Sequence, residues 1–471
     1  AFFYAPQNPA LFGEIRLKQP TVDPAVWLKN QWSKIPFEGT LHLEDVSKLD
    51  PYLVNALCAL PGVKVLKISD KDKLPHLRRE ICVSSNTLED LILENMALNS
   101  SSFGLCDQLT SVILKNVRLG GDSFKGCQPL ANLQKLCLEA CNVDEAVMSW
   151  IGRQFSLTDL VLRGVLPSGG VGPFECLKNL SHLKHLELID SHLKPKDLKV
   201  IRHLKQLCQF ITTGVVLDRD IIEAIVQNSQ FYRLVLVASG LTGQNIAPLQ
   251  QAVSDGKLPR LKTLSLAGNK LCAEDVRFIE KMPQLTYLSL NDVVQGYRLL
   301  PLLNHRHLLE CSLSNTGLIL EDIQLLCQGI KKHPLPTKVR KLNLGDNPLQ
   351  MSALDVLLQL WHSTGFNGGI TVGNVLIASK EADAINKKCQ AQISDAKKQG
   401  RTLQPFTVSA GYWPPQRLDQ VNCVMQNGTV VRKPSAPTAF VTTPSVAVAE
   451  AAQAPDAAGP APMDVDEATA A

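Results

Sequence analysis

Three histidines and two cysteines are the side chains of this sequence best suited to chemistry. The segment SHLKHLELIDSHLK carries His182, His185 and His192, and the segment LCLEAC carries Cys137 and Cys141. Imidazole and thiolate groups bind Zn²⁺ only when they converge on one point. We place His185 in a short strand, with one histidine before the strand and one after it, so the three do not converge. Cys141 points inward and Cys137 outward, so we expect neither a metal site nor a disulfide here.

Motifs for nucleotide binding or catalysis are absent from the sequence. It contains no GxxxxGK[ST], no GxGxxG after a strand, no HExxH, no GxSxG and no kinase motif set. The glycine-rich SGGVGP at 168–173 follows a proline and is typical of a lengthened turn, with a phosphate cradle as the alternative. We therefore expect no enzymatic activity, no cofactor and no small-molecule substrate.

A basic stretch, HLKPKDLKVIRHLK at 192–205, is the remaining candidate for a charged partner. Its lysines and arginine favour a solvated helix face, and the alternative is an anionic partner such as RNA or an acidic protein surface. No aromatic side chains are interleaved for stacking on bases, so we do not expect nucleic acid as the partner.

Composition is typical of a globular protein without a membrane-spanning segment. The 471 residues are 45% hydrophobic and 20% charged, with a net charge of +4. No run of about eighteen apolar residues occurs. The 13 cysteines are scattered and odd in number, which favours reduced thiols and an intracellular, cytoplasmic protein, with the nucleus as an alternative. The first residue is alanine, so a preceding domain or signal stays open, as does the oligomeric state.

Leucines recur in a pattern that repeats along the chain. When each repeat is numbered from its first leucine, apolar residues stand at positions 1, 4 and 6 and near position 11. Successive copies begin 21 residues (Leu88 to Leu109) to 31 residues (Leu308 to Val339) apart. The clear copies are LEDLILENMAL from Leu88, LTSVILKNVRL from Leu109, LQKLCLEACNV from Leu133, LTDLVLRGVL from Leu157, LKHLELIDSHL from Leu183, LKTLSLAGNKL from Leu261 and VRKLNLGDNPL from Val339. Weaker copies start at Val63, Leu207, Phe231, Leu285 and Leu308, with frayed ones around Leu41 and Ile370.

This set of motifs resembles the leucine-rich repeat superfamily, in its irregular intracellular type, with the C-terminal half closest to ribonuclease-inhibitor-like repeats. Alternation within LxxLxL turns positions 4 and 6 to one face of a strand and positions 3, 5 and 7 to the other. A single strand cannot bury its leucines, but stacked coils can. We therefore predict an α/β fold: a curved leucine-rich repeat solenoid with a parallel concave sheet and with helices and turns on the convex side.

Position 9 departs from the family pattern. Leucine-rich repeats commonly place Asn or Cys there, where a buried side chain bonds the backbone of adjacent coils. Here the position is Asn only at 269 and 347 and Cys at 141. Valines, which cannot make these bonds, occupy several coils, so we expect those coils to be closed differently. The other occupants are Met96, Val117, Val165, Ser191, Val215, Ser239, Val293 and Thr316.

The two ends are expected to cap the solenoid. Residues 1–37 are rich in aromatic side chains that would plug the first coil, and 38–378 form the solenoid of about 12 to 14 coils. Residues 379–400 read as a capping helix with Ser379 as N-cap, residues 401–433 as an irregular extension, and residues 434–471 as a disordered Ala/Pro-rich tail with an acidic end.

Side chains at positions 5 and 7 face the concave side and are the candidate binding surface. Position 5 is apolar over many coils and turns to serine and asparagine in the last ones, so β propensity alone did not impose the apolar column. At position 7 the charge alternates in sign. The candidate protein-binding residues are Ile92, Glu94, Ile113, Lys115, Glu139, Val161, Arg163, Glu187, Ile211 and Val235.

We expect a non-enzymatic module that binds another protein on this concave sheet. One alternative is the substrate-receptor part of a ubiquitin-ligase-type assembly, whose recruiting domain would precede residue 1. Another is a small-GTPase regulator, since some proteins of this superfamily accelerate GTP hydrolysis, and Arg163 or Arg340 would then be the exposed arginine. A purely structural spacer is the fourth hypothesis.

Overall fold

The described part of the chain forms one compact unit that ends at Arg432. The computed structural model describes residues 14–18, 39–44, 62–70, 85–98, 106–119, 124, 127–167, 174–191, 193, 195–293, 307–332, 339–362, 368–399, 401–413, 415–420, 423–427 and 429–432. The aromatic residues expected to plug the first coil, the SGGVGP segment, His192 and the 434–471 tail lie outside these ranges.

A parallel sheet runs through the whole unit. Within the described ranges it has 16 strands that pair in chain order, apart from β7 and β9, which form a small separate sheet. The strands of the long sheet are β1 (Glu14–Lys18), β2 (Gly39–Glu44), β3 (Val63–Ser69), β4 (Asp90–Leu98), β5 (Ser111–Leu119), β6 (Lys135–Glu139), β8 (Asp159–Arg163), β10 (His185–Ile189), β11 (Gln209–Thr213), β12 (Arg233–Val237), β13 (Thr263–Ser265), β14 (Tyr287–Ser289), β15 (Glu310–Ser312), β16 (Lys341–Asn343), β17 (Gly369–Val375) and β18 (Phe406–Ala410). The separate pair is β7 (Asn142–Val143) and β9 (Leu166–Pro167). The predicted leucine-rich repeat solenoid is confirmed.

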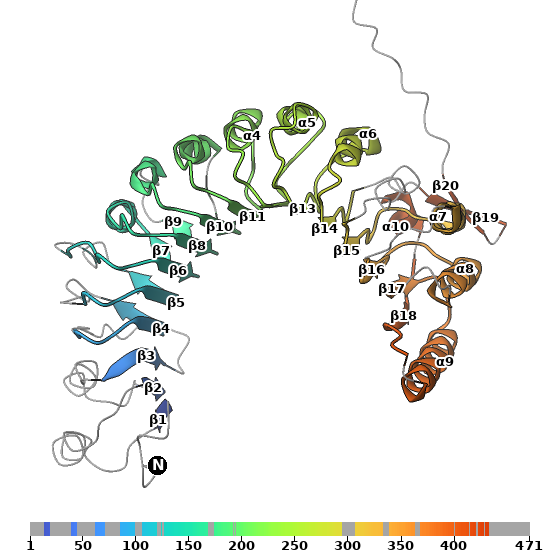
Figure 1. Cartoon of the computed structure of the whole chain (residues 1–471), viewed down its shortest axis with the longest axis horizontal. Helices are drawn as coiled ribbons and strands as arrows, with labels where there is room; N and C mark the ends of the chain where they lie inside the picture. Colours follow the sequence, from blue (N-terminus) through green and yellow to red (C-terminus); the bar gives the residue numbers. More distant parts are fainter. Residues whose placement is uncertain are drawn as a thin grey trace, which may run out of the picture. The chain divides into compact units, whose positions relative to one another are not determined.

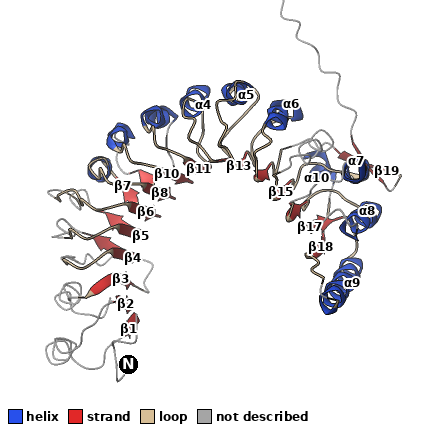
Figure 2. Ribbon diagram, viewed as in Figure 1, coloured by secondary structure: helices blue, strands red, loops and turns tan. Residues whose placement is uncertain are grey.

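From the coil of β6 onward, the helices that the structure describes lie in the return legs, on the outer side of the sheet's curve (Figures 1 and 2). Short α- or 3₁₀-helices serve the middle coils and longer helices the last ones. They are α3 (Glu145–Ile151), η4 (Phe174–Asn179), η5 (Pro195–His203), α4 (Arg219–Val226), α5 (Ala247–Ser254), α6 (Ala273–Val276), η6 (Arg277–Lys281), α7 (Leu320–Lys332), α8 (Met351–His362), α9 (Ser379–Lys398) and, beyond the coils, α10 (Pro415–Gln420). Since helices are wider than the spacing of paired strands, the strands must line the inner, concave side.

The repeated leucines form one continuous core. Leu136, Leu160 and Leu264 at position 4 have no exposed surface, and each pairs in register with its neighbours in the adjacent coils. Eight of the described cysteines are buried, and all eleven described cysteines are free thiols, so several serve as small apolar side chains.

Position 8 turns the chain in every coil from that of β4 to that of β17. Its φ is positive in twelve consecutive coils, and its N–H extends the ladder: that of Ala140, for example, donates to Arg163 O at 2.8 Å. Glycine, asparagine and aspartate tolerate this backbone conformation best, and they occupy ten of these twelve corners. The residues are Asn95, Asn116, Ala140, Gly164, Asp190, Gly214, Ala238, Gly268, Asp292, Asn315, Asp346 and Asn374.

Position 9 is buried and bonds the backbone wherever it carries a polar group. The Asn269 Oδ1 accepts from Ser239 N and Leu241 N at 2.9 and 3.0 Å. Asn347 makes the equivalent bonds three coils later, and the Cys141 thiol donates to a carbonyl of the preceding coil. Where position 9 is Val117, the Leu119 N–H donates to Asn142 Oδ1 at 2.7 Å instead. The coil of Val117 is thus closed differently, as expected.

The sheet extends further than residues 38–378 at both ends. Strand β1 pairs with β2 inside the expected N-terminal flank, and β18 pairs with β17 inside the expected irregular extension. The capping helix α9 covers β18, since the Asn386 side chain bonds both the N–H and the carbonyl of Val408. The N-cap of α9 is Ala378, whose N–H donates to Glu381 at 2.8 Å, so the expectation for Ser379 was wrong by one residue.

The chain after β18 folds back over earlier coils. A hairpin of β19 (Cys423–Gln426) and β20 (Thr429–Arg432) follows α10. Trp413, Leu418, Cys423 and Val430 pack with Ile319 in a second, small apolar cluster. The irregular extension is therefore a folded clasp, which we define as residues 411–432.

A buried ion pair fixes the end of the clasp. Arg432 Nη2 lies 2.6 Å from Asp322 Oδ2 and also donates to Gly317 O at 3.0 Å. Asp322 is 2% exposed, and burial raises the pKa of its carboxyl, an effect that Arg432 opposes.

Thr212 offers a test of the leucine column. It stands at position 6 between Leu188 and Leu236, it is fully buried, and its hydroxyl has no hydrogen-bond partner among the described residues. Thr212→Val should raise the free energy of unfolding by about 1 kcal/mol, because it removes a desolvated hydroxyl at constant volume. The matched control is Thr316→Val, which removes a 2.8 Å bond to Leu313 O and should lower stability by about 1 kcal/mol. Equal effects in urea denaturation would contradict the prediction.

Removing Arg432 tests the clasp. Arg432→Met should lower the free energy of unfolding by about 3 kcal/mol near neutral pH, because the buried Asp322 carboxylate loses its cation. The raised pKa of Asp322 rises further, so the deficit should shrink as pH falls and the carboxyl becomes neutral. Urea denaturation across a pH series measures this. The control, Asp220→Asn, removes an exposed partner of Lys199 and should change stability far less than Arg432→Met does at neutral pH; a pH-independent loss in Arg432→Met would refute the assignment.

Candidate functional site

The sheet register brings all ten predicted binding residues onto one face. Ile92, Ile113, Val161, Glu187 and Ile211 share one column with Val235, in which each residue pairs with its counterpart in the next strand. The second column runs through Glu94, Lys115, Glu139 and Arg163. The two columns lie side by side on the concave surface.

The middle of this surface is less exposed than the alternation predicted. Val161 and Glu187 are each 6% exposed and Cys137 is 8% exposed, whereas Ile92, Ile113, Ile211 and Val235 are half-buried. The expectation of an exposed apolar column is therefore wrong at its centre. On the inner side of a curved sheet, neighbouring outward side chains cover one another, and Arg163 reaches across to Glu187 of the next strand.

Charges in the N-terminal half of the concave face compensate one another. Glu94 Oε1 lies 3.6 Å from Lys115 Nζ and 4.0 Å from Lys67 Nζ, so one carboxylate bridges two neighbouring coils. These side chains are partly exposed, and such pairs contribute little to stability. Their consequence is a surface with little unpaired charge to offer a partner.

Glu187 is the centre of a tighter network. Arg163 Nη2 and Nε lie 2.6 and 2.7 Å from its Oε1, which raises the pKa of the guanidinium through the hydrogen bond. His185 Nε2 lies 3.6 Å from Glu187 Oε2, and its Nδ1 lies 3.2 Å from Asp159 Oδ1. The Arg163 guanidinium is thus held by Glu187 within the protein.

The two histidines of the SHLKHLELIDSHLK segment that the structure describes lie at different places relative to strand β10. His185 lies on the concave face, whereas His182 precedes the strand and is exposed. In the part of the chain that the structure describes, no group of three His, Cys, Asp or Glu side chains could hold a metal ion. Burial raises the pKa of Cys137, and it raises that of Cys141 to about 11, so neither thiol is poised as a nucleophile.

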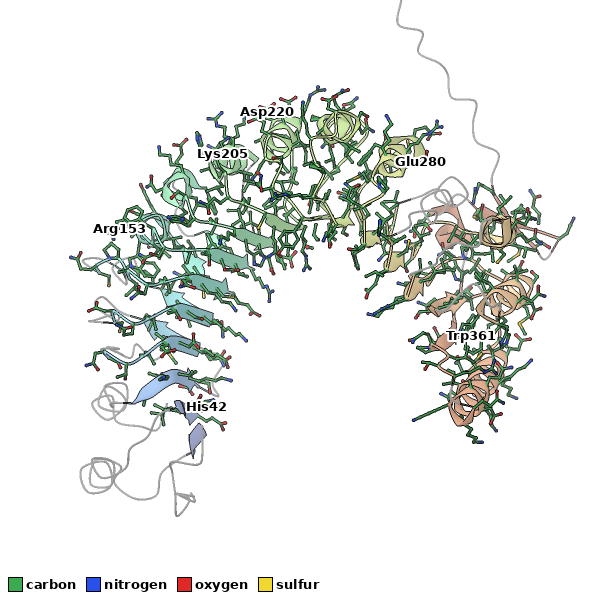
Figure 3. The ribbon with its side chains drawn as sticks, in the orientation of Figure 1. His42, Arg153, Lys205, Asp220, Glu280 and Trp361 are labelled. Atoms are coloured by element: carbon green, nitrogen blue, oxygen red, sulfur yellow. The ribbon has the colours of Figure 1, made fainter. Side chains whose placement is uncertain are left out.

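The basic stretch lies on the outer side, in the 3₁₀-helix η5. Lys199 Nζ pairs with Asp220 at 2.7 Å, while Arg202 and Lys205 are exposed. Figure 3 places Lys205 and Asp220 on the outer side with Arg153 and Glu280. Among the helices that the structure describes, none is long and apolar enough to cross a bilayer.

Two hollows lie on the concave face of the last coils, where sequence analysis placed only Val235 and, for the GTPase alternative, Arg340. The first, the serine hollow, has a volume of about 600 Å³ and spans β12 to β15. Its lining includes Arg233, Val235, Val237, Ser265, Ser289 and Tyr287. The second, the terminal hollow, has a volume of about 1060 Å³ and spans β15 to the start of β18. Its lining includes Leu309, Arg340, Lys341, Asn343, Gly369 and Pro405.

Small side chains create these hollows. Ser265 and Ser289 occupy the column that carries valine and isoleucine in earlier coils, so the sheet surface is lower there. Beyond them, Asn291, Ser312 and Asn343 hydrogen-bond one another across the coils, with Ser312 Oγ 2.7 Å from Asn291 Oδ1 and 2.9 Å from Asn343 Nδ2. In the sequence, the hollows are signalled by the change from branched to small residues at position 5. That change indicated where the apolar column ends, and it did not by itself predict a depression in the surface.

Comparisons with known proteins identify neither a family nor a function for this chain. No protein-family model and no curated protein sequence matches the chain. Among solved structures, an internalin from Listeria monocytogenes is 16% identical, with a TM-score of 0.42 over 71% of this chain and 87% of that one. A leucine-rich repeat protein from Leptospira interrogans is 18% identical, with a TM-score of 0.43 over 79% of this chain and 98% of that one.

The Arg163–Glu187 pair yields a prediction about the concave centre. Arg163→Met keeps the apolar stem but leaves Glu187 buried without its cation, which should lower the free energy of unfolding by about 1–2 kcal/mol, a value discounted because Arg163 is partly exposed. The matched variant Lys115→Met removes a looser partner of Glu94 and should change stability by less than about 0.5 kcal/mol. Chemical denaturation of both variants checks this, and indistinguishable losses would contradict it.

Proposed function

We propose that this chain is a non-enzymatic protein-binding module whose concave sheet holds a partner protein. The observation that carries the proposal is the pair of hollows on the concave face. Because the strands pair with their neighbours in register, the hollows are the places on this sheet where side chains of a partner could enter. Depressions between ordered side chains are where a partner's protruding side chains are best desolvated.

Rigidity supports the same role. Every coil from β4 to β17 is fixed by its parallel neighbours and by the corner at position 8. A surface that is already ordered loses little conformational entropy on association, so more of the contact energy appears as affinity.

The alternatives use the same surface in larger assemblies. No observation favours the ubiquitin-ligase adaptor. For the GTPase regulator, Arg163 is held by Glu187, which leaves Arg340 of the two arginines named from the sequence. We therefore keep the general binding module as the proposal.

A pair of valine variants tests it. Val235 lines the serine hollow and is half-buried, whereas Val216, which follows β11, is 55% exposed and lines neither hollow. In affinity purification from the native cell, Val235→Asp should reduce recovery of the partner at least about tenfold, because a carboxylate would be desolvated against it. Val216→Asp should leave recovery unchanged.

Both variants must keep the melting temperature of the parent protein for the comparison to count. A spacer without a binding surface would retain the same associated proteins in both variants. That result would refute the proposal.

A further inference from the structure

The serine hollow and the terminal hollow lie next to each other along the concave face, and we call the two together the track. Leu309 lines both of them, so it stands as the ridge between two adjacent depressions. Together they run across β12 to β18, at right angles to the strands. A ligand that fills both must therefore be extended and must cross the coils in succession.

The floor of the serine hollow accepts a large apolar side chain. Ser265 and Ser289 are 5% and 4% exposed and form a closed base, while Val235, Val237 and Tyr287 supply apolar wall. Leu309, Leu342 and Pro405 give the terminal hollow a similar apolar character. Aromatic or large aliphatic side chains bury the most area in such places.

The rim of the track carries unpaired positive charge. Arg233 lines one end of the serine hollow and Arg340 the terminal hollow, and both are exposed with no carboxylate partner among the described residues. Lys262 precedes β13 on the same edge and is also exposed. Between them Lys341 Nζ pairs with Glu310 Oε1 at 2.9 Å. This half of the face thus differs from the N-terminal half, where Glu94 forms ion pairs with Lys67 and Lys115.

We propose that the partner contributes an extended acidic segment with two large apolar residues, one seated in each hollow, and with carboxylates opposite Arg233 and Arg340. The inference rests on the proposed function and specifies its partner's chemistry. The unpaired arginines lie beside apolar depressions. Each carboxylate of the partner can therefore form a charge-assisted hydrogen bond with an arginine, while the partner's adjacent apolar side chain is buried in a hollow.

The fold sets the spacing of the two anchors. The middle of the serine hollow lies near β13 and β14 and that of the terminal hollow near β16 and β17, which is about three strand spacings or roughly 14 Å. An extended chain advances about 3.3 Å per residue, so the two apolar residues should stand about four positions apart. That spacing turns both side chains to the same side.

A nucleic acid is the competing ligand for the same arginines. The two hollows are lined by aliphatic groups such as Val235 and Leu342 as well as by Tyr287, and a sugar–phosphate backbone carries no large apolar side chain that could fill them. These observations favour the acidic peptide.

Phage display tests the inference without a known partner. A library of random peptides about twelve residues long, enough to span the track, is panned over the full chain and, in parallel, over Arg340→Glu and Arg153→Glu variants. Arg340→Glu reverses a rim charge, whereas Arg153→Glu makes the same change on the outer side (Figure 3). Both arginines are exposed, so the fold should survive, as a thermal melt verifies.

The parent chain and Arg153→Glu should enrich acidic peptides with two large apolar residues about four positions apart. As synthetic peptides these should bind Arg340→Glu at least about tenfold more weakly than the parent. Filling the serine hollow with Ser289→Phe should weaken them similarly. Enrichment of basic or uncharged peptides, no enrichment, or binding of a single-stranded oligonucleotide in their place would overturn the inference.

The outcome separates this inference from the proposed function. If partner recovery depends on Val235 while panning yields no acidic peptides, the chain binds proteins by another chemistry and only the present inference fails. If recovery does not depend on Val235 either, both fail.

Discussion

Stacking of coils is the constraint on which the whole structure depends. A strand only three to nine residues long with leucine on one face cannot bury that face unless another coil lies against it. Strand pairing in strict chain order then sets the register, and the register places like positions of successive repeats next to one another. Columns of side chains on the concave face follow directly from this geometry.

Curvature decides what those columns become. Helices on the outer side keep the coils apart there, so side chains on the inner side crowd together, and residues such as Val161 and Glu187 are covered although they point away from the core. Where serine replaces valine or isoleucine, the crowding is relieved and hollows remain. The size of the side chain at position 5, more than its polarity, decides where the concave surface is raised and where it is depressed.

Periodicity, together with the family resemblance that it carries, was sufficient to predict the fold, because a strand with leucine at positions 4 and 6 must be buried by stacking against other coils. Leu136, Leu160 and Leu264 lie in the core for that reason. The corners were equally visible, since Asn, Asp or Gly stands at position 8 in ten of twelve coils, although that column was not recognised. The clasp and the hollows were not predictable in this way. They depend on contacts such as Arg432 with Asp322, between residues 110 positions apart, and on the volumes of side chains from several coils at once.

The clasp alters how such an array can come apart. In a solenoid each coil contacts only its neighbours, so the terminal coils ordinarily fray one at a time. Here the clasp returns to Gly317, Ile319 and Asp322, so β15 to β18 and their helices are tied into a loop. Loss of the last coil must also break the contact with the fourth from the end. The C-terminal third therefore unfolds as a cooperative block. Coils that precede β15 are not tied by the clasp and can open locally.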